Sequence, residues 1–309
     1  MKLSLWAATA SSAALVMSGS VEAVLPLSRW PLIMAHDAAT TYLPDGNLIY
    51  AWVKTQSSGG FGKLAACGAL ALDVRPLLVA QEDRSGSKLI MAHGVVPVNV
   101  ELREAVDDAA AWWAAGDRSQ PVLLYLNHFS GDSPYSSADA RDASLALLSN
   151  RSDVRILRGT EVDTVDVPSL LRQGQGLLVV LEEDVLENWD AQVVCFSPKP
   201  RFRCIGGALS NQNDAFARLR DYLAAVTRQP LAPGKLTMIQ AHWQTSGTSD
   251  IMGQLWQSSI LEMTAKSAVN SWVRDQPLNA SAIQLLEVDD ACDPAVAQIK
   301  AMLDAARAA

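Results

Sequence analysis

The sequence has 309 residues, of which 49% are hydrophobic and 19% are charged, and its formal net charge is -8. This composition excludes a disordered tail or a low-complexity linker, and the acidic balance argues against nucleic-acid binding. The length allows two domains or one large α/β barrel, because such barrels commonly use about 250 residues.

The first 23 residues differ in composition from the rest of the chain. Lys2 gives a positive start, the run from Leu3 to Met17 is apolar and small, and Ala23 follows at a suitable cleavage position. A transmembrane anchor is the alternative, but the apolar stretch is short and contains Thr and Ser. We therefore expect a secretory signal peptide at 1–23 and a secreted, monomeric single domain at 24–309.

Short aliphatic and β-branched runs alternate with helical patterns along the remaining chain. The predicted strands are 31–36, 70–75, 88–93, 122–127, 176–182, 236–242 and 283–289. The predicted helices are 101–115, 138–148, 214–227, 254–271 and 294–308. Near-continuous apolar strands between helices are typical of a parallel sheet that is buried on both faces. The pattern favours one (β/α) barrel over two domains.

Four cysteines follow the predicted signal peptide, and an even number in an oxidising compartment indicates two disulfides. Cys195 and Cys204 flank a Pro-rich basic loop, so we expect a local bridge there, with Cys67 and Cys292 paired by elimination. Buried free thiols are the alternative.

Every histidine of the chain closes a predicted strand. These are His36, His93, His128 and His242. Barrel enzymes carry their chemistry at the carboxyl ends of the strands, where this sequence also places Asp37, Asp73, Arg75, Asn127, Glu183, Trp243 and Asp289. A hydrogen-bonded structural role is the alternative for each histidine, and we expect it for His242.

Two histidines, supporting carboxylates and one arginine can together cleave a phosphodiester. One imidazole takes a proton from an attacking hydroxyl and the other gives a proton to the leaving oxygen, because imidazole titrates near neutral pH. The planar guanidinium of Arg75 is suited to binding two phosphate oxygens as negative charge develops. An internal ion pair between Asp73 and Arg75 is the alternative reading.

Six segments with these residues resemble, in the same order, the X domain of phosphatidylinositol-specific phospholipase C, a distorted TIM barrel. They are 32–40, 64–75 and 91–94, with weaker likeness at 121–130, 167–181 and 285–289. The resemblance implies that His36 is the general base, supported by Asp289 or Asp290, and that His93, paired with Asp37, is the general acid. It implies that Arg75 and Asp73 complete the phosphate site.

The family has a calcium-dependent form and a metal-independent form. Calcium needs six to eight oxygen ligands, but here Ala71 precedes Asp73 by two positions and Arg75 stands where a ligand would be. We therefore expect no catalytic metal and no cofactor. The resemblance implies a phosphatidylinositol or glycosylated phosphatidylinositol substrate at a membrane surface and a cyclic inositol phosphate product. Asn127, His128, Glu183 and Trp243 are the candidate headgroup contacts, and no protein partner is implied.

Two other readings remain open. A glycerophosphodiester phosphodiesterase or sphingomyelinase D type barrel also uses two histidines, but it holds a divalent metal through a Glu-x-Asp pair that Ala71 and Asp73 do not provide. A secreted, inactive member of the fold that binds lipid headgroups or glycans is the other.

Overall fold

The computed structural model describes residues 24–45, 50, 53–81, 86–94, 96–116, 118–187, 212–242 and 260–308, with three short strands at 195–196, 203–204 and 207–208. The predicted signal peptide, Trp243 and the first part of the predicted helix 254–271 lie outside these residues. Within the described ranges, every helix is too short or too polar to span a lipid bilayer.

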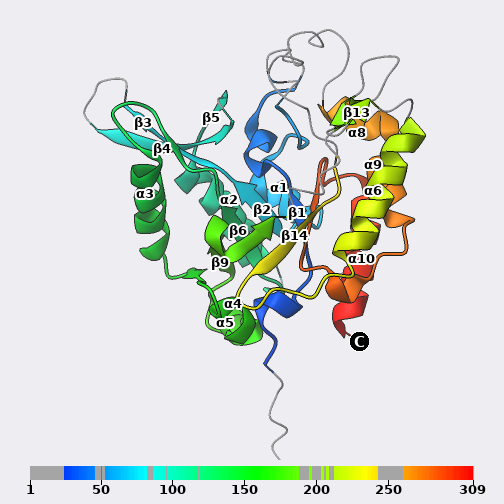
Figure 1. Ribbon diagram of the computed structural model, residues 1–309. Helices are drawn as coiled ribbons and strands as arrows, with labels where there is room; N and C mark the ends of the chain where they lie inside the picture. Colours follow the sequence, from blue (N-terminus) through cyan, green and yellow to red (C-terminus); the bar gives the residue numbers. More distant parts are fainter. Residues whose placement is uncertain are drawn as a thin grey trace, which may run out of the picture.

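An eight-stranded, curled parallel sheet forms the centre of the molecule (Figure 1). Its strands are β1 (Leu32–Ala35), β2 (Ala71–Val74), β6 (Val122–Leu126), β8 (Val154–Ile156), β9 (Leu177–Leu181), β10 (Val185–Glu187), β14 (Leu236–Gln240) and β15 (Leu285–Val288). Their order is β10-β14-β15-β1-β2-β6-β9-β8, and every pair is parallel. Only η3 (Glu182–Asp184) separates β9 from β10, so a three-residue link joins strands near opposite ends of the strand order. The fold is an incomplete (β/α) barrel, as predicted.

One predicted strand of the barrel belongs elsewhere. The segment 88–93 lies in β4 (Ser87–His93), which pairs antiparallel with β3 (Pro76–Ala80) and β5 (Val96–Glu101) in a separate sheet that also contains β7 (Ser130–Gly131). β3 starts two residues after β2 ends and forms a hairpin with β4, so no helix follows β2 directly. This sheet lies at the upper left of Figure 1, above α3.

Helices cover the outside of the barrel. They are α1 (Gly60–Ala66), α2 (Leu102–Ala115), α3 (Ser137–Ser149), α4 (Glu161–Thr164), α5 (Val167–Arg172), α6 (Gln212–Val226), α8 (Ile260–Ser267), α9 (Val269–Arg274) and α10 (Pro294–Ala308). Short 3-10 turns are η1 (Leu27–Arg29), η2 (Ala38–Tyr42) and η5 (Ala280–Ala282). A capping box between Ser136 and Asp139 begins α3. The predicted helix 254–271 is interrupted between α8 and α9, because Ala268 has a φ of 53° and cannot continue a helix.

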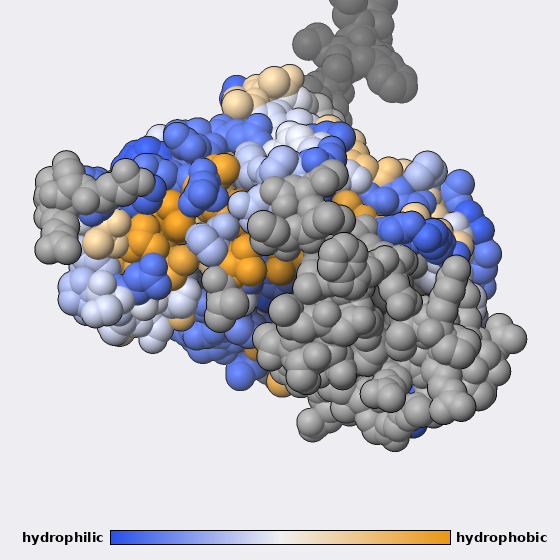
Figure 2. All heavy atoms as spheres, turned by 90° about the horizontal axis from the view of Figure 1, so that it is seen from above, coloured by the Kyte–Doolittle hydropathy of each residue, from blue (hydrophilic) through white to orange (hydrophobic). Residues whose placement is uncertain are grey.

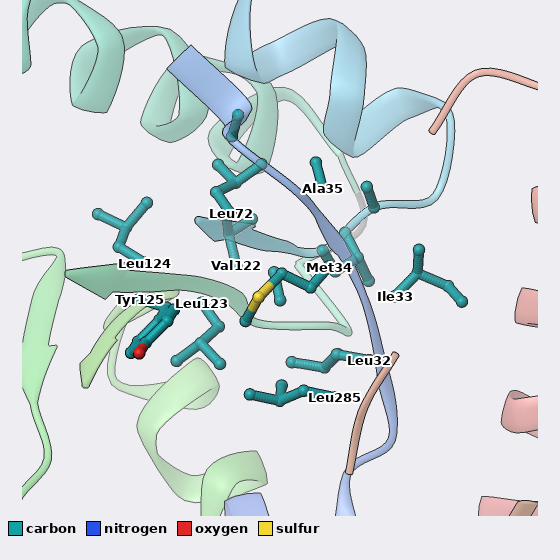
Figure 3. Close-up of a cluster of buried hydrophobic side chains, with 14 of the residues drawn as sticks. Leu32, Ile33, Met34, Ala35, Leu72, Val122, Leu123, Leu124, Tyr125 and Leu285 are labelled. Atoms are coloured by element: carbon teal, nitrogen blue, oxygen red, sulfur yellow. The ribbon is translucent and has the colours of Figure 1, made fainter. Parts of the chain in front are cut away.

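The barrel interior is filled by alternate residues of the strands. Figure 3 shows Leu32, Met34, Leu123, Tyr125 and Leu285 gathered on one side of the strands, whereas Ile33 points away from them. All of these side chains are buried, so both faces of the sheet are covered. The two-residue repeat of the parallel strands therefore aims one set of side chains at the interior and the other at the helices. At the carboxyl ends the same repeat delivers polar side chains.

A disulfide joins Cys67, at the end of α1, to Cys292, between β15 and α10. This confirms the pairing that was expected by elimination. The strands β11 (Cys195–Phe196) and β12 (Arg203–Cys204) place Cys195 opposite Cys204 in antiparallel register, but their side chains lie outside the described part of the structure. The second predicted bridge therefore stays a prediction.

Candidate active site

Three strands of the barrel sheet end in the same way. Each is followed by one buried polar residue and then by a residue in the left-handed region: His36 and Asp37 after β1, Asn127 and His128 after β6, and Asp289 and Asp290 after β15. The φ angles of Asp37, His128 and Asp290 are 45°, 48° and 46°. Residues with a Cβ adopt this conformation at a cost in energy, and such positions gather at functional sites. The chain turns sharply at each strand end, with a polar side chain left beside the barrel.

The imidazole of His36 is held by a carboxylate from the last strand. Its Nδ1 lies 2.8 Å from Oδ1 of Asp289, and both side chains are buried. The structure thus places Asp289 at His36. The side chain of Asp290 turns the other way and accepts a hydrogen bond of 2.6 Å from the hydroxyl of Ser57.

Asp37 lies at the centre of the cluster. Its Oδ2 is 3.1 Å from Nε2 of His36 and 3.0 Å from Nε2 of His93, while its Oδ1 is 2.7 Å from a terminal nitrogen of Arg75. Its side chain is almost fully buried. One carboxylate therefore bridges both histidines and the arginine.

Arg75 is fixed by two carboxylates at once. Besides Asp37, its second terminal nitrogen donates to Oδ2 of Asp73 at 2.9 Å. Oδ2 of Asp73 also accepts the backbone N–H of Asp37 at 2.8 Å, and Oδ1 accepts the amide of Asn127 at 2.6 Å. The guanidinium is presented in one orientation, which bidentate phosphate binding requires.

His93 reaches the cluster from the antiparallel sheet. It is the last residue of β4, and its Nδ1 lies 2.8 Å from the carbonyl oxygen of Val53. An acceptor oxygen lies close to each ring nitrogen, so a doubly protonated ring faces an acceptor on both sides. The geometry is compatible with a proton donor.

The buried charges shift the pKa values of the cluster. Burial opposes the charge of His36, but Asp37, Glu287 and Asp289 together raise its pKa to about 10. Burial also disfavours the ionised form of Asp37, yet Arg75, His93 and His36 hold the pKa of this carboxyl below its usual range. Burial lowers the pKa of His93, and although Asp37 opposes this, the charges of Arg75 and His36 add to it. In the resting site His36 is the more basic of the two imidazoles.

A short connector joins the ends of β1 and β15. The side-chain amide of Gln56 donates to the carbonyl oxygens of His36 and Val288 at 2.9 and 3.0 Å and accepts from the backbone of Ala291 at 2.9 Å. The hydroxyl of Thr55 donates to the same His36 oxygen at 2.7 Å. These bonds hold the backbones that carry His36 and Asp289 at a fixed spacing. Thr55 and Gln56 were not singled out from the sequence, because nothing in a loop pattern indicates which groups their side chains bind.

A second buried pair, His242 and Glu287, lies behind His36. A structural role was expected for His242, and Glu287 was not singled out from the sequence. Nε2 of His242 is 2.9 Å from Oε2 of Glu287, and the rings of His242 and His36 stack with their centroids 4.0 Å apart. Glu287 could have been found, because it lies two residues before Asp289 and so points to the same side of β15. Nearby, Tyr125 donates to Glu187, and burial raises the pKa of Glu187 to about 7.

The four residues that were predicted to contact the headgroup lie in different surroundings. Asn127 is buried and bonded to Asp73, and the exposed His128 contacts Asn127 through Nδ1 while its backbone N–H donates to Glu182 at 3.1 Å. Glu183 is exposed at the surface, where it pairs with Arg141 and, at 2.9 Å, with Arg158. Among the described side chains, Glu183 is therefore bonded to arginines and not to the cluster. Trp243 lies outside the described residues.

Two groups of ligand-type side chains lie close together among the described residues. In the first, His36, Asp37 and Asp73, the guanidinium of Arg75 already contacts both carboxylates and supplies the positive charge that would offset them. In the second, His36, His242 and Glu287, the two rings stack only 18° from parallel, so their in-plane lone pairs do not converge on one point. We assign neither group as a metal site.

The cluster lies at the carboxyl ends of the barrel strands, at the top of Figure 1. Figure 2 views this end and shows a hydrophobic area (orange) on the side of the antiparallel sheet, bordered by hydrophilic residues. That sheet has a small apolar cluster of its own, formed by Leu77, Ile90 and Ala92 with Val79 packed against it.

Comparison with known proteins identifies the fold. No protein-family model matches the sequence, and no curated protein matches it significantly. Among solved structures, a Staphylococcus aureus phosphatidylinositol-specific phospholipase C is similar with a TM-score of 0.60 and 16% identity over 89% of this chain and 92% of the other. The Listeria monocytogenes enzyme of the same name is similar with a TM-score of 0.54 and 10% identity over 90% and 94%. The chain therefore has the fold of the bacterial phosphatidylinositol-specific phospholipases C, an incomplete TIM barrel.

Proposed function

We propose that the protein is a secreted phosphodiesterase that cleaves phosphatidylinositol, or a glycosylated form of it, without a metal ion. Support comes from the shared fold and from the predicted sequence segments that carry His36, Arg75 and His93. The observation that carries the proposal is Asp37, whose single carboxylate contacts both imidazoles and the guanidinium. An acid, a base and a phosphate ligand are thus held around one buried carboxylate by ion pairs.

The reaction is an attack within the inositol phosphate. Nε2 of His36 takes the proton of the inositol 2-hydroxyl, and the hydroxyl oxygen forms a bond to phosphorus. The bond between phosphorus and the glycerol oxygen breaks, and that oxygen takes a proton from His93. The products are diacylglycerol and a cyclic inositol phosphate. Nucleophile and phosphorus belong to one molecule, so the step gains from proximity.

Each supporting group has a defined task. Asp289 orients His36 through Nδ1 and stabilises the imidazolium that forms, as the third member of a catalytic triad does. Arg75 binds the phosphate oxygens, and Asp73 with Asn127 keeps the guanidinium in place. The reaction needs an unprotonated His36 and a protonated His93. The raised pKa of His36 and the lowered pKa of His93 favour the reverse arrangement at rest, so the reactive form is the less populated one.

The charges around the cluster favour an inositol ring without additional phosphates. The positive charge of Arg75 is already matched by Asp37 and Asp73. Glu187, Glu287 and Asp289 add further carboxyl groups near it. Extra phosphate groups would be repelled there, so plain or glycosylated phosphatidylinositol is the proposed substrate class.

The test is the product mixture from vesicles of mixed phospholipids with a chelator present. We expect diacylglycerol and a cyclic inositol phosphate from the inositol lipid alone, identified by mass spectrometry. Loss of activity with the chelator would favour the metal-dependent glycerophosphodiesterase type. Binding without cleavage would favour the inactive, headgroup-binding form. The variants His36→Ala and His93→Ala should each abolish product formation, and activity that survives both changes contradicts the mechanism.

A further inference from the structure

A second histidine and carboxylate pair lies behind the catalytic one, and the proposed reaction does not use it. His242 and Glu287 are joined at 2.9 Å, and their side chains are 0% and 2% exposed. Burying such a pair costs energy through desolvation, and well-packed apolar residues would often serve stability equally well. The pair is therefore better explained by what it does to its neighbour than by stability.

That neighbour is His36. The two imidazole rings stack at 4.0 Å with an angle of 18°. A hydrogen bond to Asp289 and an ion pair with Asp37 hold the two ring nitrogens of His36, but these contacts leave the ring able to rotate about the line that joins them. A flat ring packed against its face removes this motion. The face contact and the edge contacts together fix the orientation of Nε2.

Glu287 anchors the stacked ring. It lies on β15 two residues before Asp289, so both carboxylates point to the same side of the strand, and it pairs in register with Gln240 of β14. His242 follows β14 by two residues and therefore comes within reach of Glu287. The carboxylate also brings a negative charge close to His36, which contributes to the raised pKa of that imidazole.

We propose that His242, anchored by Glu287, is a positioning residue that fixes the tilt of the His36 ring and adjusts its affinity for a proton. The proposal rests on the function assigned to His36 above. Among the described residues, the charged and titratable groups that face His36 are Asp37 after β1, Asp73 and Arg75 on and after β2, His93 on β4, His242 after β14, and Glu287 and Asp289 on and after β15.

The charge of Glu287 is tested without substrate. The chain has only four histidines, so the ring signals can be assigned from single substitutions in protein labelled at histidine nitrogen. In Glu287→Gln, which keeps an acceptor for His242, the NMR titration midpoint of His36 should fall by about one pH unit. Glu161→Gln, at a surface carboxylate paired with Arg155, should leave it unchanged. An unchanged midpoint in folded Glu287→Gln overturns the proposal.

The ring face is tested by two double variants that bury no unpaired charge. His242→Phe with Glu287→Gln keeps a flat ring against His36, whereas His242→Leu with Glu287→Leu removes it. We expect the Phe variant to retain kcat within about threefold of Glu287→Gln, and the Leu variant to lose a further tenfold or so with little change in KM. Equal kcat values for the two double variants, at matched urea midpoints, contradict a positioning role.

The two proposals fail in different ways. If the wild-type protein releases no cyclic inositol phosphate, the proposed reaction is wrong, and the NMR titration still decides whether Glu287 acts on His36. If product forms but the titration midpoint of His36 does not move in Glu287→Gln, the reaction stands and the positioning role is rejected.

Discussion

His36 and Asp289 are 253 positions apart in the sequence, and their side chains meet at 2.8 Å in the barrel mouth. The contact is possible because β1 and β15 are neighbours in the parallel sheet, with Ala35 paired to Val288 in register. The residue after each of these partners is then the catalytic candidate.

The first prediction follows from that contact. Asp289→Asn should lower kcat/KM by about 10²- to 10⁴-fold, because the amide does not stabilise the imidazolium and can select the wrong tautomer. Asp290→Asn is the matched control, since asparagine also tolerates the left-handed φ of 46° at that position and can still bond to Ser57. Steady-state kinetics that show similar losses in both variants would contradict the assignment of Asp289.

The second prediction concerns the guanidinium. Arg75→Lys keeps the charge but provides only one nitrogen, whereas the arginine uses separate nitrogens for Asp37 and Asp73. We expect a loss in kcat of about 10²- to 10³-fold, because the phosphate is no longer held bidentately. Arg118→Lys, at an exposed position over Trp113, should retain the wild-type rate. A near-wild-type rate in Arg75→Lys would argue against phosphate binding by this residue.

The third prediction is a pH dependence of stability. The pKa of His36 is raised from 6.5 to about 10, so folding favours its protonated form. The stability that His36 contributes should be fully present below about pH 6.5 and should be lost as the pH rises through about 10. The difference in unfolding free energy between wild type and His36→Gln, from urea titrations, should therefore shrink across this range. A constant difference would show that the pKa of His36 is not raised.

The fourth prediction concerns the disulfide, which closes a loop with a sequence separation of 225. By the chain-entropy relation, a loop of this length stabilises the folded state by up to about 5 kcal/mol. The double variant Cys67→Ser with Cys292→Ser should unfold at clearly lower denaturant concentration than wild type. Peptide mapping without reduction gives the control, because it should recover Cys67 linked to Cys292 in wild type. Equal unfolding midpoints for oxidised protein and variant would contradict the expected contribution.

Much of the site could be predicted because its side chains follow buried apolar strands. His36, Asp37, Asp73 and Arg75 lie at or just beyond the ends of β1 and β2, and parallel strands bring such ends to one edge. The choice between Asp289 and Asp290 could not be made from the sequence. It depends on which residue takes the left-handed turn, and both are aspartates.

Other parts of the fold could not be read from the pattern. The segment that ends at His93 has the apolar composition of a barrel strand, and an antiparallel strand of a hairpin can carry the same residues. The break at Ala268 was missed because alanine favours helix and gives no sign of a positive φ. Glu287 was missed although its two-residue spacing from Asp289 indicates the same side of the strand; its contact with His242 is visible only in the structure.

The pairing of β1 with β15 also sets the order in which the site can assemble during synthesis. His36 leaves the ribosome 253 residues before its partner Asp289, which follows β15 and lies in the segment that Cys292 ties to α1. A growing chain therefore carries an imidazole without its orienting carboxylate until the segment that forms β15 has been made. The proposed reaction would therefore not occur in the nascent polypeptide before β15 has paired with β1.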